Sequence, residues 1–167
     1  LSSIVAQLII IDFDGSIDRV SEKMRILYRE SQKHGVFVNL DMEEYRDLPM
    51  TVAAFKRVLS EDEFSTMKAG IVLQAYLPES HAFFAELVEW SKERYAKTGG
   101  SIKVRLVKGA NLAMERAEAE LHGWSPAPYR SKSDVDASYV RLVDAALRPE
   151  HSKAVRIGIA SHNLFHM

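Results

Sequence analysis

The sequence predicts an α/β fold in which parallel strands alternate with helices. Five short segments alternate apolar and polar residues with the period of two that is typical of a β-strand. Each of the first four is followed by a longer segment whose apolar residues recur at the spacing of an amphipathic helix. The predicted strand ends at Asp41, Tyr76 and Lys108 lie 35 and 32 residues apart, so strand and helix repeat as a regular unit.

This spacing is typical of a (βα)8 barrel, in which about 250 residues are divided among eight strand–helix units. The 167 residues would then supply only about the first five strands of such a barrel. Five parallel strands would also suit a doubly wound sheet of the flavodoxin type. In both folds, ligands bind at the carboxyl ends of the strands.

The stretch Ser101–Asn111 shows the strand pattern most clearly. One face of this strand would be apolar and the other would carry two cations: Ile102, Val104 and Leu106 on the first, Lys103, Arg105 and Val107 on the second. An unpaired buried charge is very costly. The strand is therefore either a solvated edge or a strand whose cationic face meets partners.

The remaining elements follow from turn and cap signals. The other strands are predicted at residues 1–8, 36–41, 70–76 and 154–163. N-cap side chains at Ser16, Thr51 and Ser133 would begin three of the helices, and Gly35 and Gly99 would end two of them. Aromatic residues in the helix before Gly99 are expected to pack against the sheet rather than to bind a cofactor.

The composition excludes several classes of protein. The chain is 47% hydrophobic and 27% charged, which is the balance of one globular domain. Its net charge of -1 gives no reason to expect a nucleic-acid partner. The absence of cysteine excludes disulfides and thiolate chemistry and fits a reducing cytosol. No apolar run approaches the ~18–20 residues of a membrane span.

Polar side chains gather where the predicted strands end. They are Asp41, Gln74, Arg105, Lys108, His162 and Asn163. Because the carboxyl ends of parallel strands meet at one edge, we expect a ligand site there. Gly109 follows one strand and precedes a helix that would run through Leu121, so a ligand could approach the backbone amides at the helix N-terminus. The surrounding residues form neither a dinucleotide nor a Walker pattern.

An acidic run raises the alternative of a metal site at the second strand. It consists of Asp41, Glu43, Glu44 and Asp47. Clustered carboxylates can hold a divalent cation, but this run lacks the glycine of a calcium loop. Acidic residues also suit the start of a helix, where they favour the helix dipole. We therefore expect no metal.

Four segments at predicted strand ends resemble one known family, in order and along nearly the whole chain. They are Val38–Glu44, Leu73–Tyr76, Val104–Ala110 and Ala160–Asn163. The chain resembles the proline dehydrogenases, and in particular the proline dehydrogenase domain of bacterial bifunctional proline utilization A flavoenzymes. Four linked motifs are far more specific than any one of them alone.

The resemblance implies a distorted (βα)8 barrel with FAD at the carboxyl ends of its strands. The implied reaction is oxidation of L-proline to 1-pyrroline-5-carboxylate, with a hydride passing to flavin N5 and the electrons then passing to a membrane quinone. Residues 1–167 would form a single domain, the N-terminal part of the barrel, truncated at both ends and inactive alone.

Site residues are carried over from the family by matching motif positions. Asp41 and Arg105 would be catalytic, with Arg105 beside flavin N5 and Asp41 offsetting nearby cations. The cofactor would be bound by Met42, Gln74, Arg105, Val107, Lys108, Gly109, Ala110, Ser161, His162 and Asn163. The family's strand-one lysine and the arginines that hold the carboxylate of proline would lie outside this chain.

The resemblance also implies a cytoplasmic location with access to the inner face of the membrane, where the quinone is reduced. It allows a fused aldehyde dehydrogenase domain in the parent protein. The alternative from the residues alone is a five-stranded, flavodoxin-like ligand-binding module without catalysis.

Overall fold

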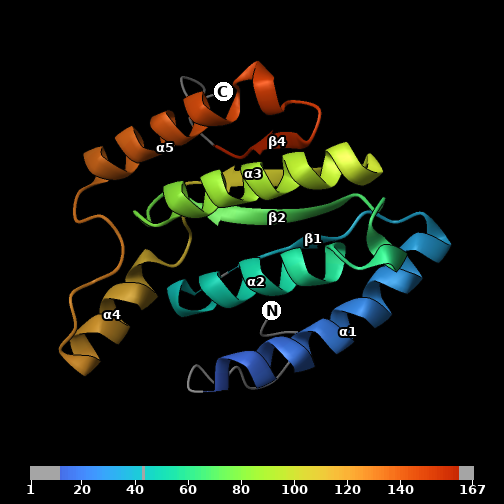
Figure 1. Cartoon of the computed structure of the whole chain (residues 1–167). Helices are drawn as coiled ribbons and strands as arrows, with labels where there is room; N and C mark the ends of the chain where they lie inside the picture. Colours follow the sequence, from blue (N-terminus) through green and yellow to red (C-terminus); the bar gives the residue numbers. More distant parts are fainter. Residues whose placement is uncertain (1–11, 43, 162–167) are drawn as a thin grey trace.

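The computed structural model describes residues 12–42 and 44–161, and the first predicted strand, at residues 1–8, lies outside them. Figure 1 shows the helices and strands. In chain order they are α1 (Phe13–His34), β1 (Asn39–Leu40), α2 (Leu48–Leu59), β2 (Ala69–Gln74), α3 (Ser80–Thr98), β3 (Ile102–Val107), α4 (Leu112–His122), α5 (Lys132–Ala146) and β4 (Val155–Ile159). Three 3-10 turns join them: η2 (Tyr45–Asp47), η3 (Asp62–Phe64) and η4 (Pro149–His151).

The strands form one parallel sheet whose spatial order, β1-β2-β3-β4, is also their order in the chain. A flavodoxin-like sheet places its first strand between the second and the third, whereas β1 and β2, the second and third predicted strands, pair directly with each other. Strand–helix–strand crossovers are right-handed, so a sheet wound in one direction carries its helices on one face. The barrel prediction is confirmed, and the flavodoxin-like alternative is wrong.

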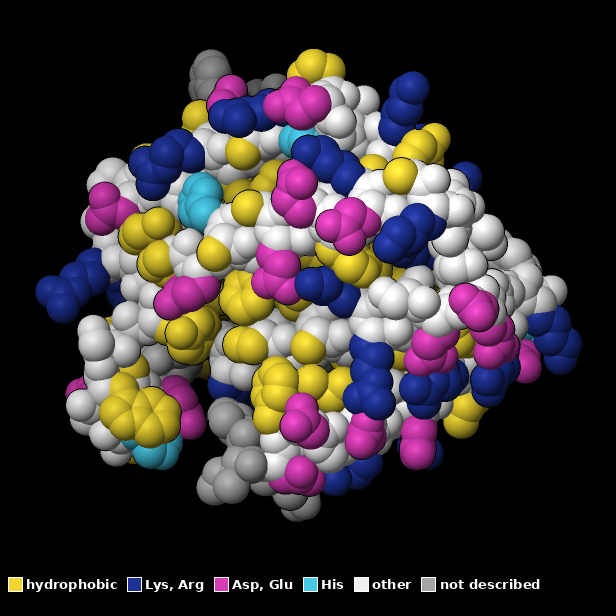
Figure 2. Space-filling model, in the orientation of Figure 1, with side chains coloured by type: hydrophobic (Ala, Val, Ile, Leu, Met, Phe, Trp, Pro, Cys, Tyr) yellow, Lys and Arg dark blue, Asp and Glu magenta, His cyan; other side chains and the backbone are white. Residues whose placement is uncertain are grey.

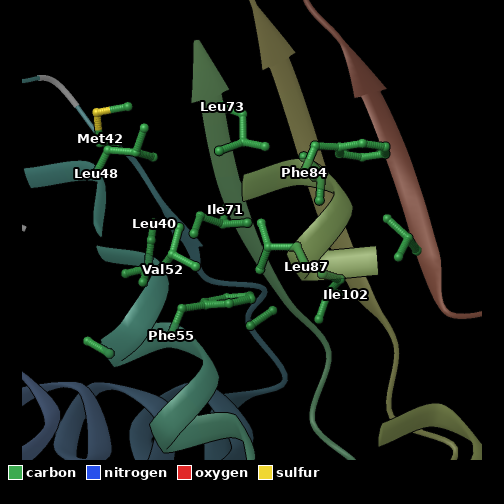
Figure 3. Close-up of a cluster of buried hydrophobic side chains, with 14 of the residues drawn as sticks. Leu40, Met42, Leu48, Val52, Phe55, Ile71, Leu73, Phe84, Leu87 and Ile102 are labelled. Carbon is green, nitrogen blue, oxygen red and sulfur yellow. The ribbon is translucent and has the colours of Figure 1, made fainter. Parts of the chain in front are cut away.

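The core lies between the sheet and the helices that cover it. Figure 1 shows α2 and α3 lying over the sheet, with α1 along the β1 side and α5 along the β4 side. Figure 3 shows Leu40 of β1 and Ile71 of β2 facing Val52 and Phe55 of α2. Burial of such side chains contributes about 1.5–3 kcal/mol each. This burial determines which face of each strand packs against the helices and which face points away from them.

The opposite face of the sheet carries polar and charged side chains. On β3, Ile102, Val104 and Leu106 are buried and Lys103 and Arg105 are exposed, as the alternation predicts. Paired residues in a parallel sheet point to the same side. The register therefore places two rows on this open face: Asn39, Gly70, Lys103 and Arg156 in one, and Val72, Arg105 and Gly158 in the next.

Three strands are shorter than predicted, and one of them is β2, which ends at Gln74 rather than at Tyr76. The strand predicted at 36–41 is observed only at Asn39 and Leu40, which pair with Gly70 and Ile71. The Val38 oxygen still accepts from the Gly70 amide at 2.9 Å, and Phe37 is 49% exposed. β4 spans Val155–Ile159, so the described residues Ala154, Ala160 and Ser161 of the strand predicted at 154–163 lie outside it.

Three predicted N-caps are wrong, because each helix begins upstream of the residue chosen. Asp12 caps α1, where its carboxylate accepts from the Gly15 amide at 3.2 Å. Ser131 caps α5, with its hydroxyl accepting from the Asp134 amide at 3.1 Å. Helix α2 begins at Leu48 with a proline in its first turn, so Thr51 lies inside the helix. Proline favours that first turn.

Both predicted helix-ending glycines are confirmed. Gly35 and Gly99 have φ values of 62° and 75°, in the left-handed region that glycine adopts at little cost.

The surface shown in Figure 2 carries Lys or Arg and Asp or Glu side chains interspersed, without a large field of one sign. Charged pairs also link elements: the half-buried Arg25 pairs with Glu61 at 2.8 Å, and the exposed Arg29 pairs with Glu63 at 2.7 Å. Exposed pairs contribute little stability individually. Among the described helices, none has the length and apolar character needed to cross a membrane.

Candidate functional site

A cavity of about 1170 Å³ lies at the carboxyl ends of the four described strands. Nine of the predicted site residues line it: Asp41, Met42, Gln74, Arg105, Val107, Lys108, Gly109, Ala110 and Ser161. They come from β2, β3 and the segments that follow β1, β3 and β4. The predicted His162 and Asn163 lie outside the described residues.

Gln74 connects the ends of the first two strands. Its side chain is buried, and its Nε2 donates to the backbone oxygen of Met42 at 2.6 Å. The Ser80 hydroxyl donates to the Gln74 backbone oxygen at 2.7 Å, which ties β2 to the start of α3. A buried, hydrogen-bonded amide is held in one orientation. Gln74 therefore fixes the segment at Asp41 and Met42 against the cavity.

Arg105 stands on the open face between two residues that leave it room. In register it is flanked by Val72 of β2 and Gly158 of β4. A Cβ at Gly158 would lie 3.0 Å from the Cε of Lys103 and 3.7 Å from the Cβ of Arg105, so glycine leaves space beside both side chains. The Arg105 side chain is exposed and lines the cavity. It can present a planar set of donors to a ligand.

The turn after β3 requires glycine. Gly109 has a φ of 134°, and a Cβ at this position would overlap the ring of Tyr76. The Tyr76 amide donates to the Lys108 oxygen at 2.8 Å, which holds the turn against the end of β2. The backbone at Lys108 and Gly109 therefore passes closely over a buried ring, and its outer side lines the cavity.

Lys108 belongs to a charged cluster at the edge of the cavity. Its ammonium donates to Asp136 of α5, which also accepts from Lys132 at 2.7 Å. Hydrogen bonds from Lys108 and then Lys132 lower the pKa of the Asp136 carboxyl to about 2. Asp136 is therefore ionised at neutral pH, and two cations face one anion.

Asp41 is exposed at the cavity, whereas the adjacent Met42 is buried. Within the described residues no group of three or more His, Asp or Glu side chains has the geometry of a metal site. The Asp41 carboxylate adds a negative charge to a cavity that also contains Arg105, Lys108 and Lys132.

Sequence reasoning missed several cavity residues. They are Glu44, Val72, Asn111, Met114, Lys132, Ile159 and Ala160. Lys132 and Asp136 are spaced for a helix ion pair, which was the one available signal. Nothing local links that pair to Lys108, because the contact forms only when α5 packs beside β3.

A second cavity of about 640 Å³ lies between η2, α4 and the segment after α4. One of its polar groups is Glu115, whose carboxylate accepts from the Tyr45 amide at 2.7 Å. Burial raises the pKa of Glu115. None of the predicted site residues lines this cavity.

The larger cavity exceeds the range of about 300–1000 Å³ that is usual for drug-sized ligands. Its cations suit phosphate groups, Gly109 brings the backbone close, and Arg105 can donate to a planar polar ring. These residues fit a large ligand that bears phosphates. The parallel strands lie side by side in chain order, and the cavity lies at their carboxyl ends. Both features are those of the (βα)8-barrel class, whose active sites lie at the carboxyl ends of the strands.

Comparisons with known proteins identify the family. The sequence matches the proline dehydrogenase family over residues 2–167. The chain belongs to the proline dehydrogenase family, as the four motifs at the strand ends predict.

Two solved structures and one curated relative illustrate the likeness. Proline utilization A from Corynebacterium freiburgense is 53% identical, with a TM-score of 0.94 over 99% of this chain. Proline utilization A from Bdellovibrio bacteriovorus, inactivated by N-propargylglycine, is 37% identical, with a TM-score of 0.85 over 92% of this chain. Hydroxyproline dehydrogenase from Rattus norvegicus is 30% identical over 118 residues, 70% of this chain.

The chain spans only part of each of these proteins. It covers 17% of the Corynebacterium freiburgense chain, 16% of the Bdellovibrio bacteriovorus chain and 25% of the rat enzyme.

Proposed function

We propose that this chain forms part of an FAD-dependent enzyme that oxidises L-proline to 1-pyrroline-5-carboxylate. Family membership and 53% identity to a proline utilization A structure support the proposal. The observation that carries it is the convergence of Asp41, Gln74, Arg105 and Lys108 on one cavity at the carboxyl ends of the strands. When bound, FAD supplies the hydride acceptor, at flavin N5.

In this proposal each side chain binds or orients. Arg105 donates to the polar edge of the flavin ring, where negative charge increases on reduction. A donor that is already in position costs little reorganisation during transfer. Gln74 holds the Met42 segment in place, and Asp41 offsets the nearby cations. Lys108 and the Gly109 turn face the phosphates.

We further propose that residues 1–167 are the N-terminal part of one (βα)8 barrel in a longer polypeptide. The small share of each relative that this chain covers supports this view, as does a sheet whose described helices lie over one face (Figure 1). Remaining barrel strands would close over Lys103, Arg105 and Arg156. Ser161, His162 and Asn163 would complete the cofactor site from the fifth strand of the barrel.

The partners proposed are those of the family resemblance. A membrane quinone would accept the electrons, so the enzyme would be cytoplasmic and reach the inner face of the membrane. A fused aldehyde dehydrogenase domain in the parent protein would consume the product. A copurifying quinone-reductase activity that requires L-proline would support the first of these.

The test is an anaerobic titration of the purified full-length protein with L-proline, followed by flavin absorbance. We expect bound flavin that bleaches on addition of L-proline, and 1-pyrroline-5-carboxylate in stoichiometric amount. Hydroxyproline is the comparison substrate, because one relative is named for it. We also expect N-propargylglycine to inactivate the full-length protein.

Two results would contradict the proposal. A full-length protein without flavin that cannot be reconstituted with FAD would exclude a flavoenzyme. A protein that binds FAD but bleaches with hydroxyproline alone would keep the chemistry and replace the substrate.

A further inference from the structure

Two lysines at the edge of the cavity share one carboxylate. Lys108, after β3, and Lys132, the first residue of α5, both line the cavity. Asp136 lies one helical turn after Lys132, and its two carboxylate oxygens each accept from one of these lysines. Lys108 and Asp136 are 28 positions apart in the sequence, whereas Lys132 and Asp136 form a pair within one helix. The cluster retains a net positive charge on the cavity side.

The two lysines are held to different extents. The Lys108 side chain is 26% exposed, and its Nζ lies 5.6 Å from the ring centroid of the buried Tyr139. The Lys132 side chain is 85% exposed. Charge-assisted hydrogen bonds are strong where water is partly excluded. Asp136 and Tyr139 therefore fix the direction of Lys108, and Asp136 limits the range of Lys132.

We infer that Asp136 is a positioning residue that holds Lys108 and Lys132 in place for the phosphate groups of the dinucleotide. The inference rests on the proposed flavin site and adds a residue that does not itself line the cavity. Asp136 is an anion, so it would not touch phosphate. It acts through the two ammonium groups.

Removing the Asp136 carboxylate has two effects of opposite sign. The cluster becomes more positive, which favours an anion. The two ammonium groups also lose their shared partner and repel each other, and both flexible side chains can extend into water. At physiological ionic strength, interactions between exposed charges more than about 8 Å apart are largely screened, so the added charge acts only at short range. We expect the loss of order to outweigh the gain of charge, so that phosphate binding weakens.

The experiment compares FAD with riboflavin, which has the same ring and no phosphate. Dissociation constants of both are measured by fluorescence on the full-length apoprotein, in wild type and in Asp136→Asn. The matched control is Asp144→Asn, an exposed aspartate on the same helix. We expect Asp136→Asn to weaken FAD binding about tenfold and riboflavin binding less than about twofold, and Asp144→Asn to change neither.

A double variant checks that the effect passes through lysine. In a Lys108→Met background, Asp136→Asn should weaken FAD binding by clearly less than it does in wild type. Full additivity of the two changes would show that Asp136 acts by another route.

The outcomes separate this inference from the proposed function. If wild-type apoprotein does not bind FAD, the proposed flavin site is wrong and this inference with it. If wild type binds FAD but Asp136→Asn leaves FAD affinity unchanged or tighter, only the positioning role is wrong. Equal weakening of FAD and riboflavin would indicate a general structural role and would also overturn it.

Discussion

Arg105 is the side chain on which the proposed chemistry depends most. It projects from the centre of the sheet into the cavity, beside a glycine on β4 and a valine on β2. Its position follows from alternation alone, because its strand neighbours Val104 and Leu106 are buried against the helices. A rigid strand presents a donor with less reorganisation than a loop does.

Replacing Arg105 with methionine keeps side-chain volume and removes the donors. We expect Arg105→Met in the full-length protein to lower flavin affinity or the rate of flavin reduction by at least about tenfold, or ~1.4 kcal/mol. Stopped-flow reduction by L-proline and flavin titration measure the two quantities. Lys103→Met is the matched control, since Lys103 shares the open face but does not line the cavity. Unchanged kinetics in Arg105→Met would refute its role.

At this scale the sequence predicts the site well where the signal is local. Asp41, Gln74, Arg105 and Lys108 were identified by their places at strand ends and by family resemblance, and the structure brings all four to one cavity. Their roles remain predictions. Asp136 could not be identified, because its importance arises from a contact with Lys108 that only tertiary packing creates.

Among the helices, α3 is anchored by a buried arginine. Arg94 is 5% exposed and donates to the backbone oxygens of Leu59, Phe64 and Met67, each at 2.8 Å. Leu59 is the last residue of α2, so the cation also meets the negative end of that helix dipole. Burial lowers the pKa of Arg94 to about 10.

We expect Arg94→Met to destabilise the domain by about 3 kcal/mol, because it removes three hydrogen bonds and leaves buried carbonyl oxygens without them. Chemical denaturation of the full-length protein measures the loss. Lys97→Met, on an exposed part of the same helix, should change stability by less than about 0.5 kcal/mol. Equal stability of the two variants would show that Arg94 is not an anchor.

Contact between α3 and α5 should depend on pH. His81 Nε2 lies 2.9 Å from the Ser138 hydroxyl, and burial, then the charge of Arg141, lowers the pKa of His81. The unfolded state therefore takes up this proton first as pH falls. The contribution of His81 is complete above its ordinary pKa of about 6.5 and is lost as pH falls towards the lowered value.

Melting temperatures between about pH 5 and pH 8 test this effect. We expect the wild-type melting temperature to fall more steeply towards acid pH than that of His81→Gln, which cannot protonate. An exposed control, His122→Gln, should keep the wild-type slope. Identical slopes in all three proteins would rule out a contribution from His81.

Element boundaries show where sequence reasoning stops. The helix-ending glycines were predicted because the residue that follows a helix commonly adopts a positive φ, which glycine adopts at little cost. The N-caps were not, since in α1 and α5 an upstream polar residue forms the cap, and α2 has no side-chain cap. The length of β1 was not predicted either, because its pairing with β2 is a contact between distant parts of the chain that the local pattern does not show.

On the scale of the whole molecule, the described sheet has two unpaired edges. β1 and β4 each pair on one side only within the described residues, and Lys103, Arg105 and Arg156 are exposed on the open face. Unpaired edges favour association with other chains. We therefore expect residues 1–167 expressed alone to associate and to neither retain flavin nor oxidise L-proline.

Size-exclusion chromatography and flavin absorbance of that isolated chain test this expectation against the full-length protein. A monomeric 167-residue chain whose flavin bleaches with L-proline would show that this part of the barrel is sufficient for flavin binding and proline oxidation.

The most direct test of the central claim is a crystal structure of the full-length protein with its flavin bound. The account predicts the flavin ring in the cavity at the carboxyl ends of β1 to β4, with Arg105 within hydrogen-bonding distance of the ring and Lys108 near the phosphates. A flavin bound elsewhere, with Arg105 facing protein alone, would contradict it.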